Sequence, residues 1–343
     1  MLDVDGAYGE GGGQLLRTAL ALSVITGRAT HVYNIRARRD KPGLAPQHLA
    51  AARALATLCG AEVEGLALRS QEISFSPGSV RGGQYRIDVG TAGSVTLVLQ
   101  ALLPVMIVAA QDFEVRVTGG TDVRAAPPAD YLREVMLTHL ARMGAHVEAT
   151  IVRRGYYPGG GGEVKVQVRA AKLRPYGIDT AGAPHEVGGL AHVARLPAHI
   201  AARMRNAVVS QLSAHGGPAL RIEERVIPDD QAAGPGGAVV AWAKCAHSVL
   251  GAGGVAQRGK RAEDLGTAVG EELRADLESG AGVDAHAADQ LLVYLALAGG
   301  GSLSARTLSS HAHTAIWLIE CFLPVRFTTA TRNGLVHVSV APT

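Results

Sequence analysis

The chain has 343 residues, which suits about two domains because a domain usually takes roughly 100 to 200 residues. With 47% hydrophobic and 18% charged residues, it has the composition neither of a disordered chain nor of a coiled coil. The net charge of only +3 means that any contact with nucleic acid must come from local basic clusters. Aromatic residues make up 4%, which argues against an extensive surface for stacking bases.

The cysteines Cys59, Cys245 and Cys321 are odd in number, far apart and never in a C-x-x-C pair. They support neither a disulfide framework nor a cysteine zinc site, and a reducing cytoplasm fits them best. No apolar run reaches the ~18 residues that a membrane span needs, and the acidic, glycine-rich start of the chain is unlike a signal peptide. We therefore expect a cytoplasmic protein without a membrane partner.

Helices bounded by glycine recur at a spacing of about 80 residues. The sequence predicts one helix at 14–27 after GEGGGQ and another at 94–110 after VGTAGS. A second helix in each unit stops at a GAxVE segment, which predicts a helix end and then a strand at Gly60 and again at Gly144. A third, partial copy begins at Asp289 with DQLLVYLALAGGG.

Alternating apolar residues predict strands between these helices, so each unit is expected to be an α/β layer pair. The expected strands are Tyr33–Arg36, Glu114–Val117, Val164–Val168 and Leu335–Val340. Between about residues 184 and 283 the repeat is lost, although helices at His199–Ser213 and Ala262–Glu278 are expected there. We therefore divide the chain into a repeat-built catalytic domain, residues 1–183 and 284–343, and a smaller inserted α/β domain, residues 184–283.

Two glycine-rich segments fail as nucleotide-binding motifs. The segment GVAQRGKR, residues 254–261, almost matches a phosphate loop, but Arg261 stands where the hydroxyl that holds magnesium belongs. The run GEGGGQ is not a dinucleotide fingerprint, because Gln14 occupies the place of its last glycine. We therefore predict neither type of site.

Glu10 and Arg17 flank a glycine-rich helix start in DGAYGEGGGQLLR. Glycine lets the backbone approach a ligand, and the bare N–H groups of a helix start favour an anion. Glu10 could hold a divalent cation, and Arg17 could pair with a phosphate in a bidentate manner. The alternative is a tight turn with a solvated Glu–Arg pair.

Four cations, Arg36, Arg38, Arg39 and Lys41, fall within six residues between an expected strand and an expected helix. Such a cluster at the carboxyl end of a strand suits phosphates. Two prolines stiffen this segment, but a charged surface loop is the usual alternative for a run of charges.

A third cluster lies in SSHAHTAIWLIECF, where Ser309 or Ser310 can cap a helix and place His311 or His313 at its positive end. That position disfavours the imidazolium, so it keeps a nitrogen available as a nucleophile and attracts phosphates. A structural role is the default alternative for a histidine. No third ligand supports a metal site at His-Ala-His.

Together these segments resemble the RNA 3'-terminal phosphate cyclase family. The resemblance runs through DGAYGEGGGQLLR, IRARRDKPGLAPQHL, VGTAGSVTLVLQALLP, GGTDVRAAPPADYL, ADQLL and SSHAHTAIWLIECFLPVRF, and it covers most of the chain. It implies an α/β fold of three βαβαββ repeats, related to the enolpyruvyl-transferase and initiation-factor C-terminal folds. A smaller α/β domain is expected to be inserted before the last repeat.

The resemblance implies a ligase-type enzyme that uses ATP and an RNA with a 3'-terminal phosphate. A histidine attacks the α-phosphate of ATP, the AMP passes to the RNA 3'-phosphate, and the neighbouring 2'-hydroxyl displaces AMP to leave a 2',3'-cyclic phosphate. Matching positions make His311 the nucleophile and Glu10 the ligand of Mg²⁺ or Mn²⁺. The residues matched to nucleotide or phosphate contacts are Arg17, Arg36, Arg39, Gln47, Gln100, Asp289 and Gln290.

Two positions depart from the family pattern. Arg38 stands where the family loop commonly has glycine, so it would be strained if that position needs a positive φ. His286 stands where some members have tyrosine, which bears on how the nucleotide base stacks.

Three alternative functions follow from the same residues. A non-cyclase branch of the family works in ribosomal RNA processing but lacks the histidine that His311 matches. An enolpyruvyl transferase shares the layered architecture and would need no histidine–nucleotide intermediate. An inactive RNA-end binder could use the loop from Arg36 to Lys41 without turnover. The resemblance leaves a homodimer open as the assembly.

Overall fold

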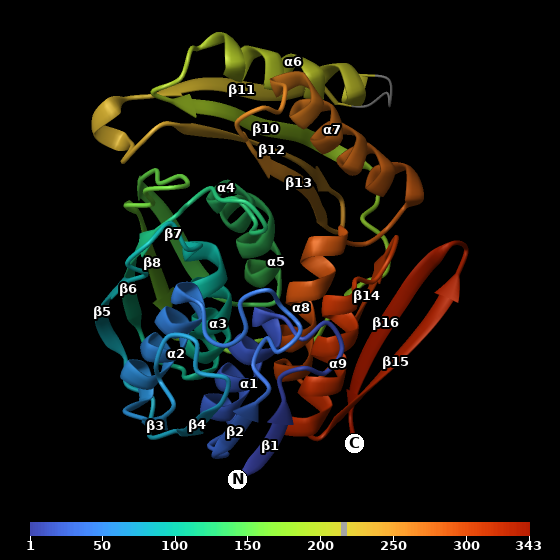
Figure 1. Ribbon diagram of the computed structural model, residues 1–343. Helices are drawn as coiled ribbons and strands as arrows, with labels where there is room; N and C mark the ends of the chain where they lie inside the picture. Colours follow the sequence, from blue (N-terminus) through green and yellow to red (C-terminus); the bar gives the residue numbers. More distant parts are fainter. Residues whose placement is uncertain (214–217) are drawn as a thin grey trace.

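The computed structural model describes residues 1–213 and 218–343. These residues form four sheets of four strands each, with helices packed on them (Figure 1). Three of the sheets share one pattern, in which the strands lie in the order first, second, fourth, third and only the first two are parallel. The α/β fold expected from the sequence is confirmed.

The first two repeats follow the order βαβαββ. The first comprises β1 (Leu2–Asp5), α1 (Gly13–Thr26), β2 (Thr30–Tyr33), α2 (Pro46–Cys59), β3 (Glu62–Glu64) and β4 (Ile73–Ser76). In the second, a π-helical turn at Leu132–Met136 joins two short helices. Its elements are β5 (Gly83–Asp88), α3 (Val95–Val108), β6 (Phe113–Gly119), α4 (Ala129–Tyr131), α5 (Leu137–Arg142), β7 (His146–Arg153) and β8 (Gly162–Arg169).

The third repeat is interrupted after its first strand. This strand, β9 (Tyr176–Ile178), pairs in parallel with β14 (Gly301–Ala305), although the inserted segment separates them along the chain. The expectation that the third copy begins at Asp289 is therefore wrong, because a strand of three residues leaves no clear apolar pattern in the sequence. The other elements of this repeat are α8 (Ala285–Leu297), α9 (Ser310–Phe322), β15 (Val325–Arg332) and β16 (Leu335–Pro342).

The inserted segment forms its own sheet, with two helices on one face (Figure 1). Its elements are β10 (Pro184–Ala194), α6 (His199–Ser213), β11 (Leu220–Ile227), β12 (Gly236–Cys245), β13 (Val249–Val255) and α7 (Ala262–Ser279). The order β11-β10-β12-β13 leaves β13 at an edge of the sheet, where it contacts α4. The segment has a separate hydrophobic core that includes Met204 and Leu273. Its definition as a domain of residues 184–283 stays a prediction.

The helices of the three repeats pack together in the middle of the molecule, and their sheets lie around the outside (Figure 1). Helix α1 contacts α2, α3 and α9, and α8 contacts α9. This central place explains why α1 and α3 are apolar over most of their surface, with side chains such as Leu20 and Leu99 fully buried. The same packing gathers the ends of these helices at one place.

One strand predicted from the sequence is wrong. A strand was expected at Tyr33–Arg36, but the strand at this place, β2, ends at Tyr33 and shares only that residue with the expected range. Asn34 and Arg36, which follow it, have left-handed φ angles of 53° and 54°. The other three expected strands lie within β6, β8 and β16. In the described part of the chain, no helix combines the length and apolar character needed to cross a membrane.

Candidate active site

A cavity of about 690 Å³ lies between the helix ends of the repeats and the edge strand β13. Residues in the first two turns of α1, α2, α3, α8 and α9 line it, and so do Tyr131 of α4 and Leu265 of α7. Helix N-termini carry unsatisfied N–H groups and the positive end of the helix dipole, so their convergence favours an anionic ligand. All nine residues proposed from the sequence line this cavity: Glu10, Arg17, Arg36, Arg39, Gln47, Gln100, Asp289, Gln290 and His311.

His311 lies in the first turn of α9, which Ser309 caps by accepting a hydrogen bond from the Ala312 N–H at 3.2 Å. The half-buried imidazole contacts Oε2 of Glu10 through Nδ1. Because Nδ1 faces the Glu10 carboxylate, Nε2 is the ring nitrogen left free to meet a ligand. His313 is exposed and does not belong to the described lining of the cavity. The geometry therefore favours His311 of the two histidines.

Glu10 is the carboxylate that joins these groups, because Arg39 contacts its Oε1 and His311 its Oε2. The sequence analysis considered a solvated Glu10–Arg17 pair as an alternative. That alternative is wrong, because the side chain of Arg17, on α1, is buried. Glu10 precedes Gly11 and Gly12 in a turn where Gly11 has a φ of 61°, a conformation that glycine adopts freely. One carboxylate beside an anion-binding cavity fits a magnesium or manganese ion held chiefly by phosphates, not a preformed cage.

Arg17 is the buried cation of the cavity, with 7% of its surface exposed. Within residues 1–213 and 218–343, its guanidinium has neither a hydrogen bond nor an ion pair. Burial lowers the pKa of Arg17 to about 10, so the side chain remains charged at neutral pH. A buried charge without a partner is costly, and this arrangement is typical of a side chain that binds an anionic ligand.

The loop after β2 brings Arg36 and Arg39 to the cavity, but Arg38 is not part of its described lining. Strain was expected at Arg38 only if that position needs a positive φ, and Arg38 is not among the residues with one. Arg36, like Asn34, has the left-handed φ in this loop instead. The Arg36 side chain donates from Nη1 to the carbonyl of Gly43 at 2.8 Å. Burial and the nearby Arg39 lower the pKa of Arg36.

Helices α8 and α9 are tied together at the cavity. Asp289 on α8 accepts a hydrogen bond from the hydroxyl of Ser309, the cap of α9, at 2.7 Å. Burial raises the pKa of Asp289. The Gln290 amide donates a hydrogen bond to the carbonyl of His286 at 3.1 Å. His286, which stands where some family members have tyrosine, also lines the cavity. The Asp289–Ser309 hydrogen bond holds the start of α9, where His311 lies, against α8.

Gln47 and Gln100 lie at the start of α2 and within α3. The Gln47 side chain accepts a long hydrogen bond, 3.4 Å, from the N–H of Ser94, which caps α3. Gln100 lines both the main cavity and a small adjoining cavity of about 40 Å³ behind it. Each of the two side chains lines the cavity, where a ligand can contact it.

His48, Arg124 and Gln257 are among the lining residues to which the sequence analysis gave no role. The ring of His48 lies where a Cβ at Gly13 would be, which explains the last glycine of GEGGGQ. Burial, together with Arg17 and Arg36, lowers the pKa of His48 to about 3 and keeps it neutral. Arg124 belongs to GGTDVRAAPPADYL, so the motif was visible, but only the fold shows that it reaches the cavity.

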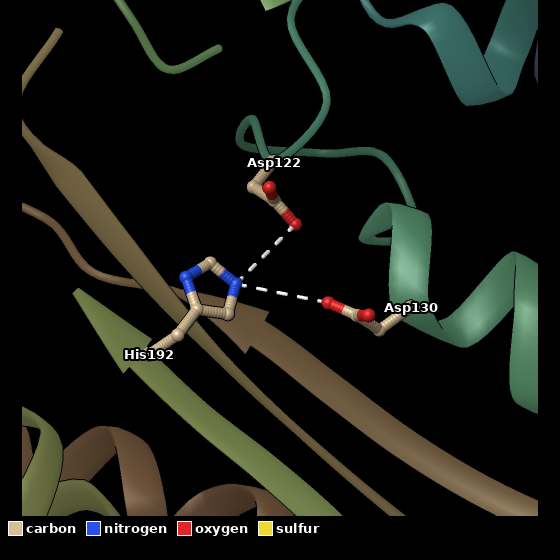
Figure 2. Close-up of side chains that lie close together, drawn as sticks. All are labelled: Asp122, Asp130 and His192. Carbon is tan, nitrogen blue, oxygen red and sulfur yellow. Dashed lines mark ion pairs between the residues drawn. The ribbon is translucent and has the colours of Figure 1, made fainter. Parts of the chain in front are cut away.

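A second polar cluster is buried between the second repeat and β10 (Figure 2). Nε2 of His192 lies 3.9 Å from Asp122 and 3.7 Å from Asp130, a grouping that could hold a metal ion. Arg154 fills this position instead, with Nη1 at 2.6 Å from Asp130 Oδ2 and 3.2 Å from Asp122 Oδ2.

The charges of this cluster are arranged as an internal salt bridge. Burial alone would lower the pKa of Arg154, but Asp122 and Asp130 raise it above its ordinary value. Burial and then Arg154 lower the pKa of His192 to about 4, so the imidazole is neutral. The cluster therefore connects the inserted segment to the second repeat through buried hydrogen bonds and not through a metal.

Fold and site define an α/β protein of three βαβαββ repeats in which five helix N-termini surround a histidine and several arginines. The sequence profile of the family described as RNA 3'-terminal phosphate cyclase matches residues 8–329. The chain is 51% identical to an RNA 3'-terminal phosphate cyclase of Nitrosospira multiformis, with 100% of this chain and 97% of the relative covered. Proteins of the same name from Caldivirga maquilingensis and Methanosarcina barkeri are 44% and 41% identical, covering 100% and 99% of this chain and 98% and 100% of the relatives.

This chain belongs to the RNA 3'-terminal phosphate cyclase family.

Proposed function

We propose that this protein is an enzyme that uses ATP to convert an RNA 3'-terminal phosphate into a 2',3'-cyclic phosphate through a covalent His311–AMP intermediate. The observation that carries the proposal is the position of His311 at the positive end of α9, with Nδ1 on Glu10, inside an anion-binding cavity. The names of the relatives, which describe a 3'-terminal phosphate cyclase, support the reaction class. The cavity volume of about 690 Å³ is also within the range of small-molecule sites.

In the first step, Nε2 of His311 attacks the α-phosphorus of ATP, a P–N bond forms, and the bond to the leaving pyrophosphate breaks. Glu10 keeps the proton on Nδ1 and stabilises the positive charge that the imidazole acquires. Arg17 and Arg39 stabilise the negative charge that develops on the phosphates. A Mg²⁺ or Mn²⁺ ion at Glu10 would add Lewis-acid polarisation of the α-phosphate when bound.

In the second step, an oxygen of the RNA 3'-phosphate displaces the imidazole, and the AMP becomes joined to the RNA through a diphosphate link. The vicinal 2'-hydroxyl then attacks the RNA phosphorus, loses its proton, and expels AMP as the cyclic phosphate forms. Arg36 and the remaining cations of the cavity would hold the terminal phosphate in line. The ring closure is intramolecular, so it needs no external nucleophile.

The alternatives predict different properties of the same site. An RNA-processing factor without turnover, or an enolpyruvyl transferase, has no use for a nucleophilic histidine at the start of α9. The three cysteines are free thiols, which supports the proposal of a cytoplasmic location. A homodimer stays a prediction.

The test is incubation with ATP labelled on its α-phosphate and Mg²⁺ or Mn²⁺, without RNA, followed by denaturing electrophoresis. We expect an acid-labile, alkali-stable label on the wild type and on the control His313→Ala, but none on His311→Ala. The two variants should have circular dichroism spectra like that of the wild type, because both side chains lie at a helix start and fill little core volume. A label that survives in His311→Ala would overturn the assignment. No label on any form would favour the alternatives.

A further inference from the structure

One wall of the cavity is built jointly by the second repeat and the inserted segment, and positively charged side chains lie on it or directly beside it. Two segments build this wall: residues 123–128 and the end of β13 with the loop after it, residues 253–257. They are neighbours, because a Cβ at Gly253 would lie 3.4 Å from the side chain of Pro128. The wall is therefore continuous from the second repeat to the inserted segment.

Three exposed cations lie on or directly beside this wall. Arg124 lines the cavity, and Arg258 and Lys260 follow the lining residue Gln257 in a turn closed by the Lys260 N–H and the Gln257 carbonyl at 3.1 Å. Within the described ranges, none of the three side chains has a hydrogen bond or an ion pair. Arg261 differs, because its Nε lies 3.7 Å from the Glu263 carboxylate.

The Arg124 segment is held at both of its ends by one side chain. Arg154 donates hydrogen bonds to Asp122, two residues before Arg124, and to Asp130, just after Pro128. Figure 2 shows these two aspartates on the second repeat facing His192 on β10. The segment is thus fixed relative to the inserted sheet before any ligand binds, which reduces the entropy lost on binding.

We propose that this wall binds the backbone phosphates of single-stranded RNA on the 5' side of its terminal nucleotide, with Arg124 nearest to the cavity and Arg258 and Lys260 further out. The inference rests on the proposed function, because it requires an RNA end to lie beside His311. Unpaired exposed cations that follow one another away from a cavity suit a chain of phosphates. Apart from Gln257, the lining residues between them are apolar or glycine and offer little for reading bases, so the binding is expected to tolerate different sequences.

The segment GVAQRGKR thereby acquires a role that its failed phosphate-loop match did not give it. In the structure it runs from the end of β13 through an exposed turn to the cap of α7. Its lysine and first arginine are directed at no carboxylate of the described chain. Such side chains contribute to affinity for RNA through the release of counterions.

The experiment compares a 3'-phosphorylated RNA of ten nucleotides with a 3'-phosphorylated dinucleotide, each titrated at several salt concentrations without ATP. The double variant Arg258→Ala/Lys260→Ala should bind the decamer about 25-fold less tightly at ~0.1 M salt, since each contact to a single strand contributes ~0.7 to the salt slope. For this variant, the slope of log affinity against log salt concentration should fall by ~1.4. The variant should bind the dinucleotide as tightly as the wild type does. Arg124→Ala should lower decamer affinity by ~5-fold.

The matched control is Arg221→Ala/Arg332→Ala, which removes two exposed arginines from β11 and β15, outside the described cavity lining. Equal decamer affinity and salt slope in the two double variants would overturn the inference, as would an equal loss with the dinucleotide. Labelling of the protein by ATP in the absence of RNA tests the proposed function separately from this inference. We expect the Arg258→Ala/Lys260→Ala protein to label as the wild type does, whereas a wild type that binds RNA as described but never labels would refute only the His311 mechanism.

Discussion

Replacing Arg17 with methionine should have opposite effects on stability and on ATP binding. The guanidinium is buried in α1 without a partner among the described residues, so the folded protein bears the cost of its desolvation until an anion binds. Methionine has a similar length and no charge. We therefore expect Arg17→Met to stabilise the ligand-free protein and to weaken its binding of ATP.

The size of both effects follows from the burial of this residue. Burial lowers the pKa of Arg17 from 12.5 to about 10, and a shift of this size corresponds to about 3.5 kcal/mol at ~1.4 kcal/mol for each pKa unit. Imperfect packing of methionine reduces the gain, so roughly 1 to 3 kcal/mol is expected. Losing charge-assisted hydrogen bonds to phosphate costs ~1.5 to 3 kcal/mol, which is about 10- to 100-fold in the dissociation constant of ATP.

Urea unfolding of the ligand-free protein and calorimetric titration with ATP measure the two effects. Arg154→Met is the matched control, because Arg154 is equally buried but serves two carboxylates, Asp122 and Asp130. Its loss leaves buried negative charge unpaired and should destabilise the protein by about 3 to 5 kcal/mol. If Arg17→Met moves the urea midpoint downward as Arg154→Met does, Arg17 has a structural partner. An unchanged affinity for ATP would show that it does not bind phosphate.

Two further predictions concern the loop with Arg38 and Arg39 and the buried histidine His139 of α5. Arg39→Ala should lower the rate of labelling by ATP far more than Arg38→Ala. The reason is that Arg39 contacts Glu10 in the cavity, whereas Arg38 donates a 3.5 Å hydrogen bond to the backbone carbonyl of Gly9. Equal losses of labelling rate in the two variants would contradict this prediction. Burial lowers the pKa of His139 from 6.5 to about 4, so the unfolded chain binds the proton first and stability present at pH 7 is lost as the pH falls from about 6.5 to 4. In His139→Gln, the fall in unfolding free energy between pH 7 and pH 4.5 should shrink by about 2 kcal/mol, and an unchanged fall would show that another group causes it.

The sequence was most informative where a local pattern has one physical outcome. Helix α6, predicted at His199–Ser213, has those bounds in the structure, because apolar and polar positions alternate with the helical period. Ser309 was one of two expected caps of α9, and it is the one that accepts the hydrogen bond from Ala312. These features depend on residues within one or two turns of each other.

Local pattern failed where a distant partner sets the backbone. The strand expected at Tyr33–Arg36 stops at Tyr33, and Arg36 takes a left-handed conformation in which it bonds Gly43 and reaches the cavity. The three-residue strand β9 exists because β14 pairs with it from beyond the inserted segment. Propensity over three or four residues is too weak to predict either result.

By itself, the sequence determined the βαβα order of the repeats and the residue types of the site, because glycine-bounded amphipathic segments and charged helix starts are local properties. Only the tertiary structure decided that the starts of several helices meet in one cavity and that Glu10 contacts His311 and not Arg17. It also decided that the Arg17 guanidinium has no hydrogen bond or ion pair to any described residue. It also decided that Arg154 occupies a place where a metal ion could bind and holds the Arg124 segment. Such relations join residues far apart in the chain, and the packing of the repeats and of the inserted sheet sets their distances.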